Sequence, residues 1–102
     1  MLSTIPTDLK KVKKEDIDKS ICRVGMIAEL DASSFYEQLA AMTDSNDIKK
    51  TLLDISKEEK THMAEFETLL LRLDKELAPE MEHGKEEVRK NTGKIRAVRT
   101  RF

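Results

Sequence analysis

Several residue types that define other protein classes are scarce or absent in this chain. Of its 102 residues, one is cysteine, none is tryptophan, three are phenylalanine and one is tyrosine. The single cysteine, Cys22, excludes an intramolecular disulfide, so a reducing cytoplasm is the simplest location. No apolar run approaches the length of a membrane span, and the N-terminus lacks the apolar core of a secretory signal. We therefore expect a cytoplasmic protein with no membrane partner.

An excess of charge of either sign is also missing. Nineteen basic residues nearly cancel twenty acidic ones, which leaves a net charge of −1. This balance argues against nucleic-acid binding by the chain as a whole. Charge itself is abundant, at 38% of the residues. Much Glu and Lys with few aromatic residues is typical of long helices with solvated faces, and the length allows one lean domain at most.

A helical stripe with a polar interruption organises the second half of the chain. Eight residues recur at alternating steps of four and three, the spacing of one helix face packed against a partner. Two of them, Glu59 and His62, are polar, and an ionised carboxylate on a buried face is costly unless a positive charge meets it. Glu-x-x-His is half of the motif with which helical bundles hold iron or manganese. The stripe consists of Ile48, Leu52, Ile55, Glu59, His62, Phe66, Leu69 and Leu73.

The first half of the chain is expected to supply an arm and one long helix. Residues 1–13 contain a proline and a cluster of lysines, and we expect a flexible arm there. The first helix should begin near Lys14–Asp16, because acidic residues gather where the helix dipole favours them. Residues 43–47, Thr-Asp-Ser-Asn-Asp, are typical of a turn and end in good N-cap residues.

A second long helix is expected after that turn. It should run from about Asp47 to Leu77 or Ala78, where Pro79 would end it because proline lacks the N–H that continues a helix. A short turn makes the two long helices antiparallel neighbours. The predicted fold is therefore all-α, an antiparallel two-helix hairpin.

A short third helix and a tail complete the expected organisation. Residues 80–90 could form the helix, although their apolar stripe is weak. Residues 91–102 are basic and short of acids, so we interpret them as a tail or a linker. The helical domain is then expected to comprise residues 14–90.

Antiparallel pairing brings three polar side chains to one height. Counted along the chain from Ser45 in the turn, Glu29 on one side is about as distant as Glu59 and His62 on the other. The hairpin can thus aim Glu29, Glu59 and His62 at a common point. Tyr36 lies two turns from Glu29 on the same face. We predict these four residues as the functional site.

One chain provides half of a paired metal site. Carboxylate sites in helical bundles use one Glu from each of two helices and Glu-x-x-His from each of the other two. Two copies of the chain would supply that set and would bury the apolar stripe in a four-helix bundle. Oxygen ligands with one imidazole per metal suit iron or manganese, and zinc can compete. Oxidation of Fe(II) at a di-iron centre is the natural chemistry of such a site.

Two segments resemble a known family. Ala-Glu-Leu-Asp-Ala-Ser-Ser-Phe-Tyr (residues 28–36) and Asp-Ile-Ser-Lys-Glu-Glu-Lys-Thr-His (residues 54–62) resemble the encapsulated ferritins, half-size ferritin-like proteins that work inside encapsulin nanocompartments. The resemblance covers about Lys14 to Leu77. Carried over by position, it makes Glu29, Glu59 and His62 the iron ligands, with Tyr36 adjacent to the metal.

The resemblance also implies an activity and partners. Such proteins form a ferroxidase site between two subunits, their dimers assemble into a decameric ring, and they deliver Fe(III) for storage in the lumen of the shell. Two departures concern details of the family. Ala28 replaces one acid of the family's metal-entry site, whereas Asp31 could stand for another, and Phe35 occupies a position where a larger aromatic is typical. The tail could be a shell-docking peptide, a linker to a fused shell domain, or a vector-derived extension.

Three other interpretations remain open at this point. The main alternative is a non-catalytic dimeric helical interaction module in which Glu59 and His62 only fix the register of the helices. A rubrerythrin-like peroxide reductase also uses Glu-x-x-His, but it usually adds a cysteine-rich iron domain that one cysteine cannot form. The basic tail could also anchor the chain to nucleic acid or a membrane.

Overall fold

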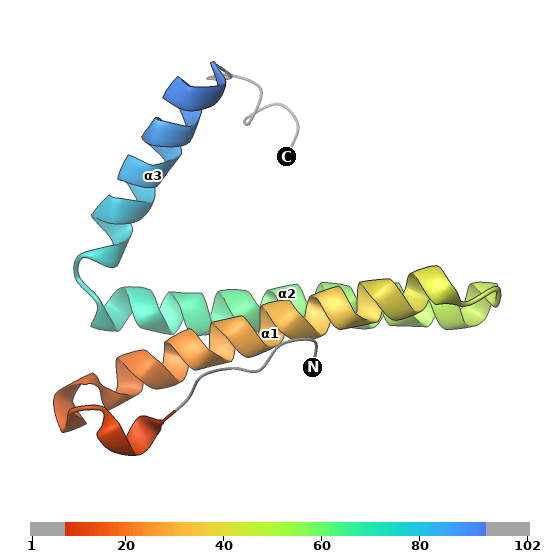
Figure 1. The fold of residues 1–102 in the computed structure, drawn as a ribbon, viewed down its shortest axis with the longest axis horizontal. Coiled ribbons are helices and arrows are strands. Elements are labelled where there is room, and N and C mark those ends of the chain that lie inside the picture. The colour runs from red at the N-terminus through yellow and green to blue at the C-terminus, as the bar shows by residue number, and fades with distance from the viewer. Residues whose placement is uncertain (1–7, 94–102) are drawn as a thin grey trace.

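Two long antiparallel helices form a hairpin, and a third helix projects away from it. The computed structural model describes residues 8–93. The elements, shown in Figure 1, are two short 3-10 helices, η1 (Leu9–Lys11) and η2 (Lys14–Asp16), followed by α1 (Ile17–Met42), α2 (Asn46–Leu73) and α3 (Leu77–Thr92). Residues 8–93 contain no strand, so the predicted all-α hairpin with a short C-terminal helix is confirmed. Part of the expected N-terminal arm thus forms η1.

The turn between α1 and α2 is held by its own side chains. Ser45 is the N-cap of α2, and its Oγ accepts a hydrogen bond from the backbone N–H of Ile48 at 3.3 Å. The Ser45 N–H in turn donates to Thr43 Oγ1 at 3.1 Å. These two hydrogen bonds stabilise the turn expected at residues 43–47, which reverses the chain between α1 and α2.

The expected end of the second helix is wrong. α2 ends at Leu73, and Pro79 lies in the first turn of α3. Proline is tolerated there because the first N–H groups of a helix have no intrahelical partner. Asp74 makes the break, because it has an extended backbone and its Oδ1 accepts a hydrogen bond from Glu76 N–H at 3.1 Å.

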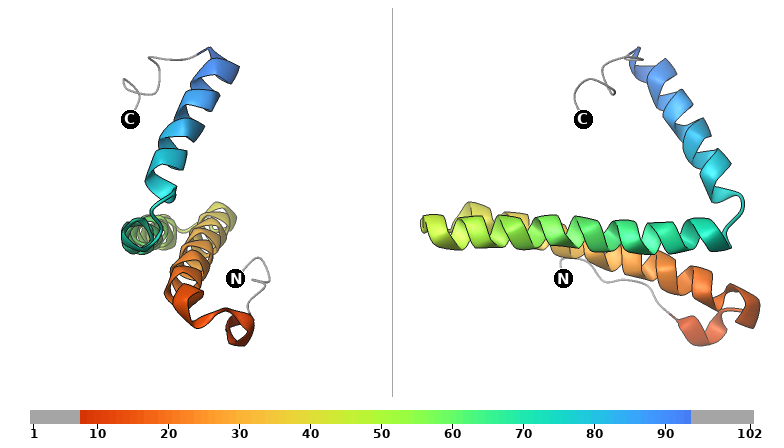
Figure 2. Two further views of the ribbon diagram at one scale, coloured as in Figure 1. Left: turned by 90° about the vertical axis from the view of Figure 1, so that its left-hand side faces the viewer. Right: turned by 180° about the vertical axis from the view of Figure 1, so that it is seen from behind.

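The third helix is longer than expected at both ends. It begins at Leu77 and reaches Thr92, beyond the expected end at Lys90. Gly93 ends it in the left-handed conformation, with φ of 65°, and its N–H donates to Arg89 O at 2.8 Å. Figure 2 shows that α3 leaves the hairpin at its open end. Of the predicted tail, residues 94–102 lie outside the described residues.

The hairpin alone encloses little core. Among the described residues, the buried apolar side chains are Cys22, Ala40 and Leu70. The predicted stripe on α2 is only partly covered, since Ile48 is 53% and Leu69 46% exposed. An open apolar face of this kind is typical of a surface that another protein covers. No helix within residues 8–93 combines the length and apolar content that a membrane crossing requires.

Candidate metal centre

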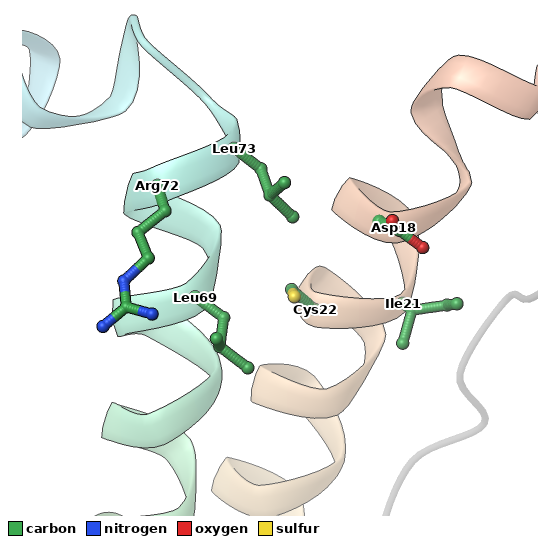
Figure 3. Close-up of a pocket in the computed structure, with 6 residues that line it drawn as sticks. All are labelled: Asp18, Ile21, Cys22, Leu69, Arg72 and Leu73. Atoms are coloured by element: carbon green, nitrogen blue, oxygen red, sulfur yellow. The ribbon is translucent and has the colours of Figure 1, made fainter.

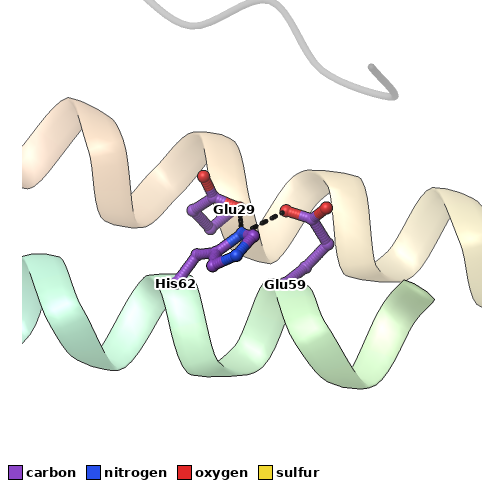
Figure 4. Close-up of side chains that lie close together, drawn as sticks. All are labelled: Glu29, Glu59 and His62. Carbon is purple, nitrogen blue, oxygen red and sulfur yellow. Dashed lines mark ion pairs between the residues drawn. The ribbon is translucent and has the colours of Figure 1, made fainter. Parts of the chain in front are cut away.

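Glu29 of α1 meets Glu59 and His62 of α2 near the middle of the hairpin. His62 Nδ1 lies 3.4 Å from Glu29 Oε2 and 3.5 Å from Glu59 Oε2 (Figure 4). One potential ligand atom from each side chain lies within 4.8 Å of the other two. The convergence expected from the distances to the turn is therefore present. The role of these residues as metal ligands stays a prediction.

One oxygen of Glu29 has His62 as an ion-pair neighbour but forms no well-formed hydrogen bond within residues 8–93. This atom, Oε2, is shielded from solvent. Hydrogen bonding with Glu59, desolvation, and repulsion from the Glu59 charge raise the pKa of Glu29, and they outweigh the opposite influence of His62. Two carboxyl groups thus crowd one point with a single imidazole to offset them, which is the arrangement a bound cation stabilises.

The same two carboxylates favour the protonated form of His62. Desolvation on its own would lower the pKa of His62, but hydrogen bonding to Glu59 and the charges of Glu29 and Glu59 raise it overall. The His62 side chain is also 47% exposed, whereas those of Glu29 and Glu59 are 22% and 18% exposed. One side of the cluster therefore stays open to solvent and to further ligands.

The stability of the metal-free protein should depend on pH in a defined direction. The pKa values of Glu29 and His62 are raised above their ordinary values of 4.5 and 6.5. A raised pKa contributes stability below the unfolded pKa, and this contribution is lost as pH rises through the folded value. The melting temperature of the metal-free chain should therefore fall as pH rises from below 4.5 to above 6.5. A Glu29→Gln variant should show a smaller fall, and a melting temperature that rises over this range would contradict the prediction.

The helices approach closely one turn from the cluster. Gly25 lies four residues before Glu29, and a Cβ atom there would come within 2.7, 2.7 and 2.8 Å of three ring atoms of Phe66. Phe66 lies four residues after His62 on α2. The ring therefore packs on the backbone of α1, and this contact requires glycine.

Substituting Gly25 should separate the helices. We expect Gly25→Ala to destabilise the fold by about 1–2 kcal/mol, because the cost of overpacking against an aromatic ring exceeds the gain in helix propensity. Gly84→Ala is the matched control, since nothing lies within 4 Å of its added Cβ, and it should be neutral or stabilising. Chemical denaturation of both variants measures the difference. Equal or greater stability of Gly25→Ala would show that the ring yields without cost.

The other singled-out residues lie nearby. Tyr36 is on α1 seven residues beyond Glu29, and its ring packs against Phe35 with centroids 5.6 Å apart. Its adjacency to a metal stays a prediction. Cys22 is a buried free thiol. It lines an open groove of about 260 Å³ between the open ends of α1 and α2, together with Leu69 and Leu73 (Figure 3).

The sequence prediction missed one pair near the cluster. Ser33 of α1 and Ser56 of α2 are the buried polar residues of the hairpin, among the residues described. The helical spacing places Ser33 on the face of Glu29, but periodicity alone gives no reason to single out Ser56. The position of the turn could have identified the pair, because Ser33 and Ser56 lie almost equally far from Ser45 on either side and should therefore face each other.

Comparisons with known proteins agree with this architecture. The Rubrerythrin family model matches residues 21–99. The chain is 45% identical over 96 residues to a ferritin-like–encapsulin shell fusion protein of Pyrococcus furiosus, covering 91% of this chain and 28% of that protein. It is 38% identical over 81 residues to the encapsulin nanocompartment cargo protein EncC of Myxococcus xanthus, covering 79% of this chain and 59% of that protein.

A solved structure matches as well. The crystal structure of the encapsulated ferritin domain from Pyrococcus furiosus superposes with a TM-score of 0.77 at 41% identity, covering 91% of this chain and 97% of that one. A helical hairpin that brings two carboxylates and an imidazole together supplies half of the donor set that ferritin-like bundles use. The chain belongs to the rubrerythrin family and, within it, to the encapsulated ferritins. The resemblance found in the sequence is thereby confirmed.

Proposed function

We propose that the chain is a ferroxidase that oxidises Fe(II) to Fe(III) at a di-iron site completed by a second copy of itself. The observation that carries this proposal is the convergence of Glu29, Glu59 and His62 within 4.8 Å on one hairpin. The shielded Oε2 of Glu29 supports it, because an oxygen without a hydrogen bond leaves a place for a cation. Iron storage is the biological role that corresponds to this activity, and membership of the encapsulated ferritins supports it.

A second copy would complete both the donor set and the core. Each chain offers two carboxylates and one imidazole, half of the ligands of a paired bundle site. The apolar side chains that the hairpin leaves open, such as Leu30 at 48% and Leu69 at 46% exposed, would be covered in the same step. Further assembly of dimers into a decameric ring remains an expectation from the family.

The residues of the cluster have separable tasks in this proposal. Glu29 and Glu59 would bind Fe(II), the substrate, through hard oxygen atoms and offset its charge, and His62 would bind it as a neutral imidazole. On oxidation each Fe(II) supplies one electron for the reduction of dioxygen. The raised pKa values of Glu29 and His62 let protons compete with the metal for these groups, so affinity should rise with pH. Manganese or zinc could occupy the same donors without this chemistry.

We also place the protein inside an encapsulin nanocompartment in the cytoplasm. The two curated relatives are a fusion of a ferritin-like part with an encapsulin shell and an encapsulin cargo protein. The shell protein is therefore the proposed partner, reached through residues 91–102 as a docking segment or as a linker to a fused shell domain. Oxidised iron would pass to the lumen of the shell for storage.

Aerobic oxidation of Fe(II) by the full chain tests the proposed activity. We expect Fe(III) absorbance to develop much faster than in buffer, with a rate that scales with protein concentration. Reduction of hydrogen peroxide by an added organic reductant, measured in a separate sample without excess Fe(II), separates a peroxide reductase from a ferroxidase. Oxidation no faster than in buffer would favour the non-catalytic helical module.

A further inference from the structure

Two serine hydroxyls face each other in the seam between α1 and α2. Ser33 is 5% and Ser56 1% exposed, and their Oγ atoms lie 2.8 Å apart. Ser33 Oγ also lies 3.3 Å from the carbonyl oxygen of Ser56, and Ser56 Oγ lies 3.1 Å from that of Ser33. Every one of these contacts joins one helix to the other.

The pair continues to the surface through two charged side chains. Ser56 Oγ donates to Glu37 Oε2 at 3.1 Å, and Lys60 Nζ lies 3.1 Å from the same oxygen. Hydrogen bonding from Lys60, then from Ser56, lowers the pKa of Glu37, which keeps this carboxyl ionised. Each hydroxyl has one proton, so Ser56 Oγ shares its proton among Glu37 Oε2, the carbonyl oxygen of Ser33 and Ser33 Oγ, and Ser33 Oγ has the carbonyl oxygen of Ser56 and Ser56 Oγ as acceptors. The result is a hydrogen-bonded network that joins the two helices across their seam.

The pair lies one helical turn from the metal centre on both helices. Ser33 follows Glu29 by four residues on α1, and Ser56 precedes Glu59 by three residues on α2. α1 contributes only Glu29 to the cluster. The height of α1, meaning its position along the axis of α2, therefore decides whether the cluster forms. A slip of one residue moves a helix by about 1.5 Å, which exceeds the roughly 0.5 Å within which a functional site must be held.

Beyond the contact of Phe66 with Gly25, apolar packing defines this height weakly. The buried apolar side chains of the described seam are Cys22, Ala40 and Leu70, two of which are small. Helices that meet through few and small apolar side chains can pack in more than one register, and buried polar pairs are known to select one.

We propose that Ser33 and Ser56 are positioning residues of the metal centre, which fix the height of α1 against α2 and so hold Glu29 opposite Glu59 and His62. The effect on metal binding rests on the function proposed above. The effect on helix register does not, since it concerns the metal-free hairpin.

The test is the Ser33→Ala/Ser56→Ala double variant of the full chain, measured in three ways. Removing both hydroxyls together leaves neither serine hydroxyl buried without its partner, so helix content by circular dichroism should be unchanged. Helix register is followed by the α-proton resonances of Gly25, which the ring current of Phe66 shifts in the metal-free protein because the ring packs on this glycine. Binding of Zn(II), a redox-inert probe, is measured by calorimetry. We expect the ring-current shift of Gly25 to be lost or averaged and the Zn(II) affinity to fall about tenfold or more.

Ala40→Gly is the control for a general loss of stability. Ala40 is buried in the same seam, seven residues from Ser33, and its methyl side chain forms no hydrogen bond. Its variant should melt at a lower temperature yet keep the Gly25 resonances and the Zn(II) affinity of the wild type. If the double variant fails to fold, Ser33→Ala alone should change both quantities in the same direction by a smaller amount, because Ser56 can still donate to Glu37.

The outcomes separate this proposal from the proposed function. Unchanged Gly25 resonances in a folded variant would overturn the positioning role, whether or not Zn(II) affinity falls, because register would then not depend on the serines. Changed Gly25 resonances with weaker Zn(II) binding would support both proposals. Changed resonances in a protein whose wild type binds no metal would support the register role and overturn the metal site.

Discussion

Replacing Glu59 by glutamine is expected to slow aerobic Fe(II) oxidation at least about 100-fold, because even residues that only support a metal ligand are worth about 10–100-fold. Glutamine keeps the shape of the side chain and removes its charge. The change also relieves the crowding of Glu59 against Glu29, so the metal-free variant should melt no lower than the wild type. The rate of Fe(III) formation and the helix content by circular dichroism are the two measurements.

Glu58→Gln is the matched control for this experiment. Glu58 adjoins Glu59 on α2 but is exposed and lies outside the metal-ligand cluster. Its variant should oxidise iron at the wild-type rate. If Glu59→Gln also retained that rate, the assignment of Glu59 as a ligand would be wrong, and the interpretation as a register-fixing polar pair would gain support.

Metal is expected to raise the melting temperature of the wild-type protein by roughly 10 °C or more. Free metal at about 100 times its dissociation constant adds about 2.7 kcal/mol of stability, and each kcal/mol is worth about 4–8 °C for a domain of this size. The shielded oxygen of Glu29 and the raised pKa values of Glu29 and His62 indicate where this energy arises. Thermal melts with Zn(II) or anaerobic Fe(II), compared with melts in chelator, provide the test.

The same melts separate a metal site from a structural bundle. Glu59→Gln should lose most of the metal-dependent rise, whereas Glu58→Gln should keep it. An identical melting temperature with metal and with chelator in the wild type would contradict the account, since a helical interaction module needs no metal.

The convergence of the cluster could be predicted because it depends on few structural variables. Two long helices joined by a short turn must be antiparallel, so similar distances from Ser45 place Glu29 beside Glu59 and His62. The interruption of the apolar stripe marks the pair on α2 from the amino-acid pattern alone. Local periodicity and one turn therefore determine the position of the cluster.

The ends of the helices were harder to predict because they depend on single local interactions. Pro79 suggests a helix end when its missing N–H is considered alone, yet the first turn of α3 accommodates it. The break comes from Asp74, whose side chain bonds Glu76 N–H at 3.1 Å and forms an ion pair with Arg23 at 3.2 Å. Arg23 is distant in sequence, so this reinforcement of the break was not visible in the local pattern.

The serine pair escaped prediction for a different reason. A serine within a helix usually faces solvent, and only a partner on the other helix makes it a buried residue. Ser56 gains that partner in Ser33, at an Oγ–Oγ distance of 2.8 Å. The packing of Phe66 on Gly25 likewise requires both helices to be in place. Such features could be sought by applying the distance from the turn to every small or polar residue.

Native mass spectrometry of the metal-loaded protein tests the central claim most directly, because it counts chains and metal ions in one particle. A site shared between two copies predicts assemblies with an even number of chains and one iron or zinc per chain, hence two per dimer. Glu59→Gln should show particles without this stoichiometric metal. Metal bound at full occupancy to single chains, or assemblies that hold no metal under the same conditions, would contradict a di-iron site built between two copies.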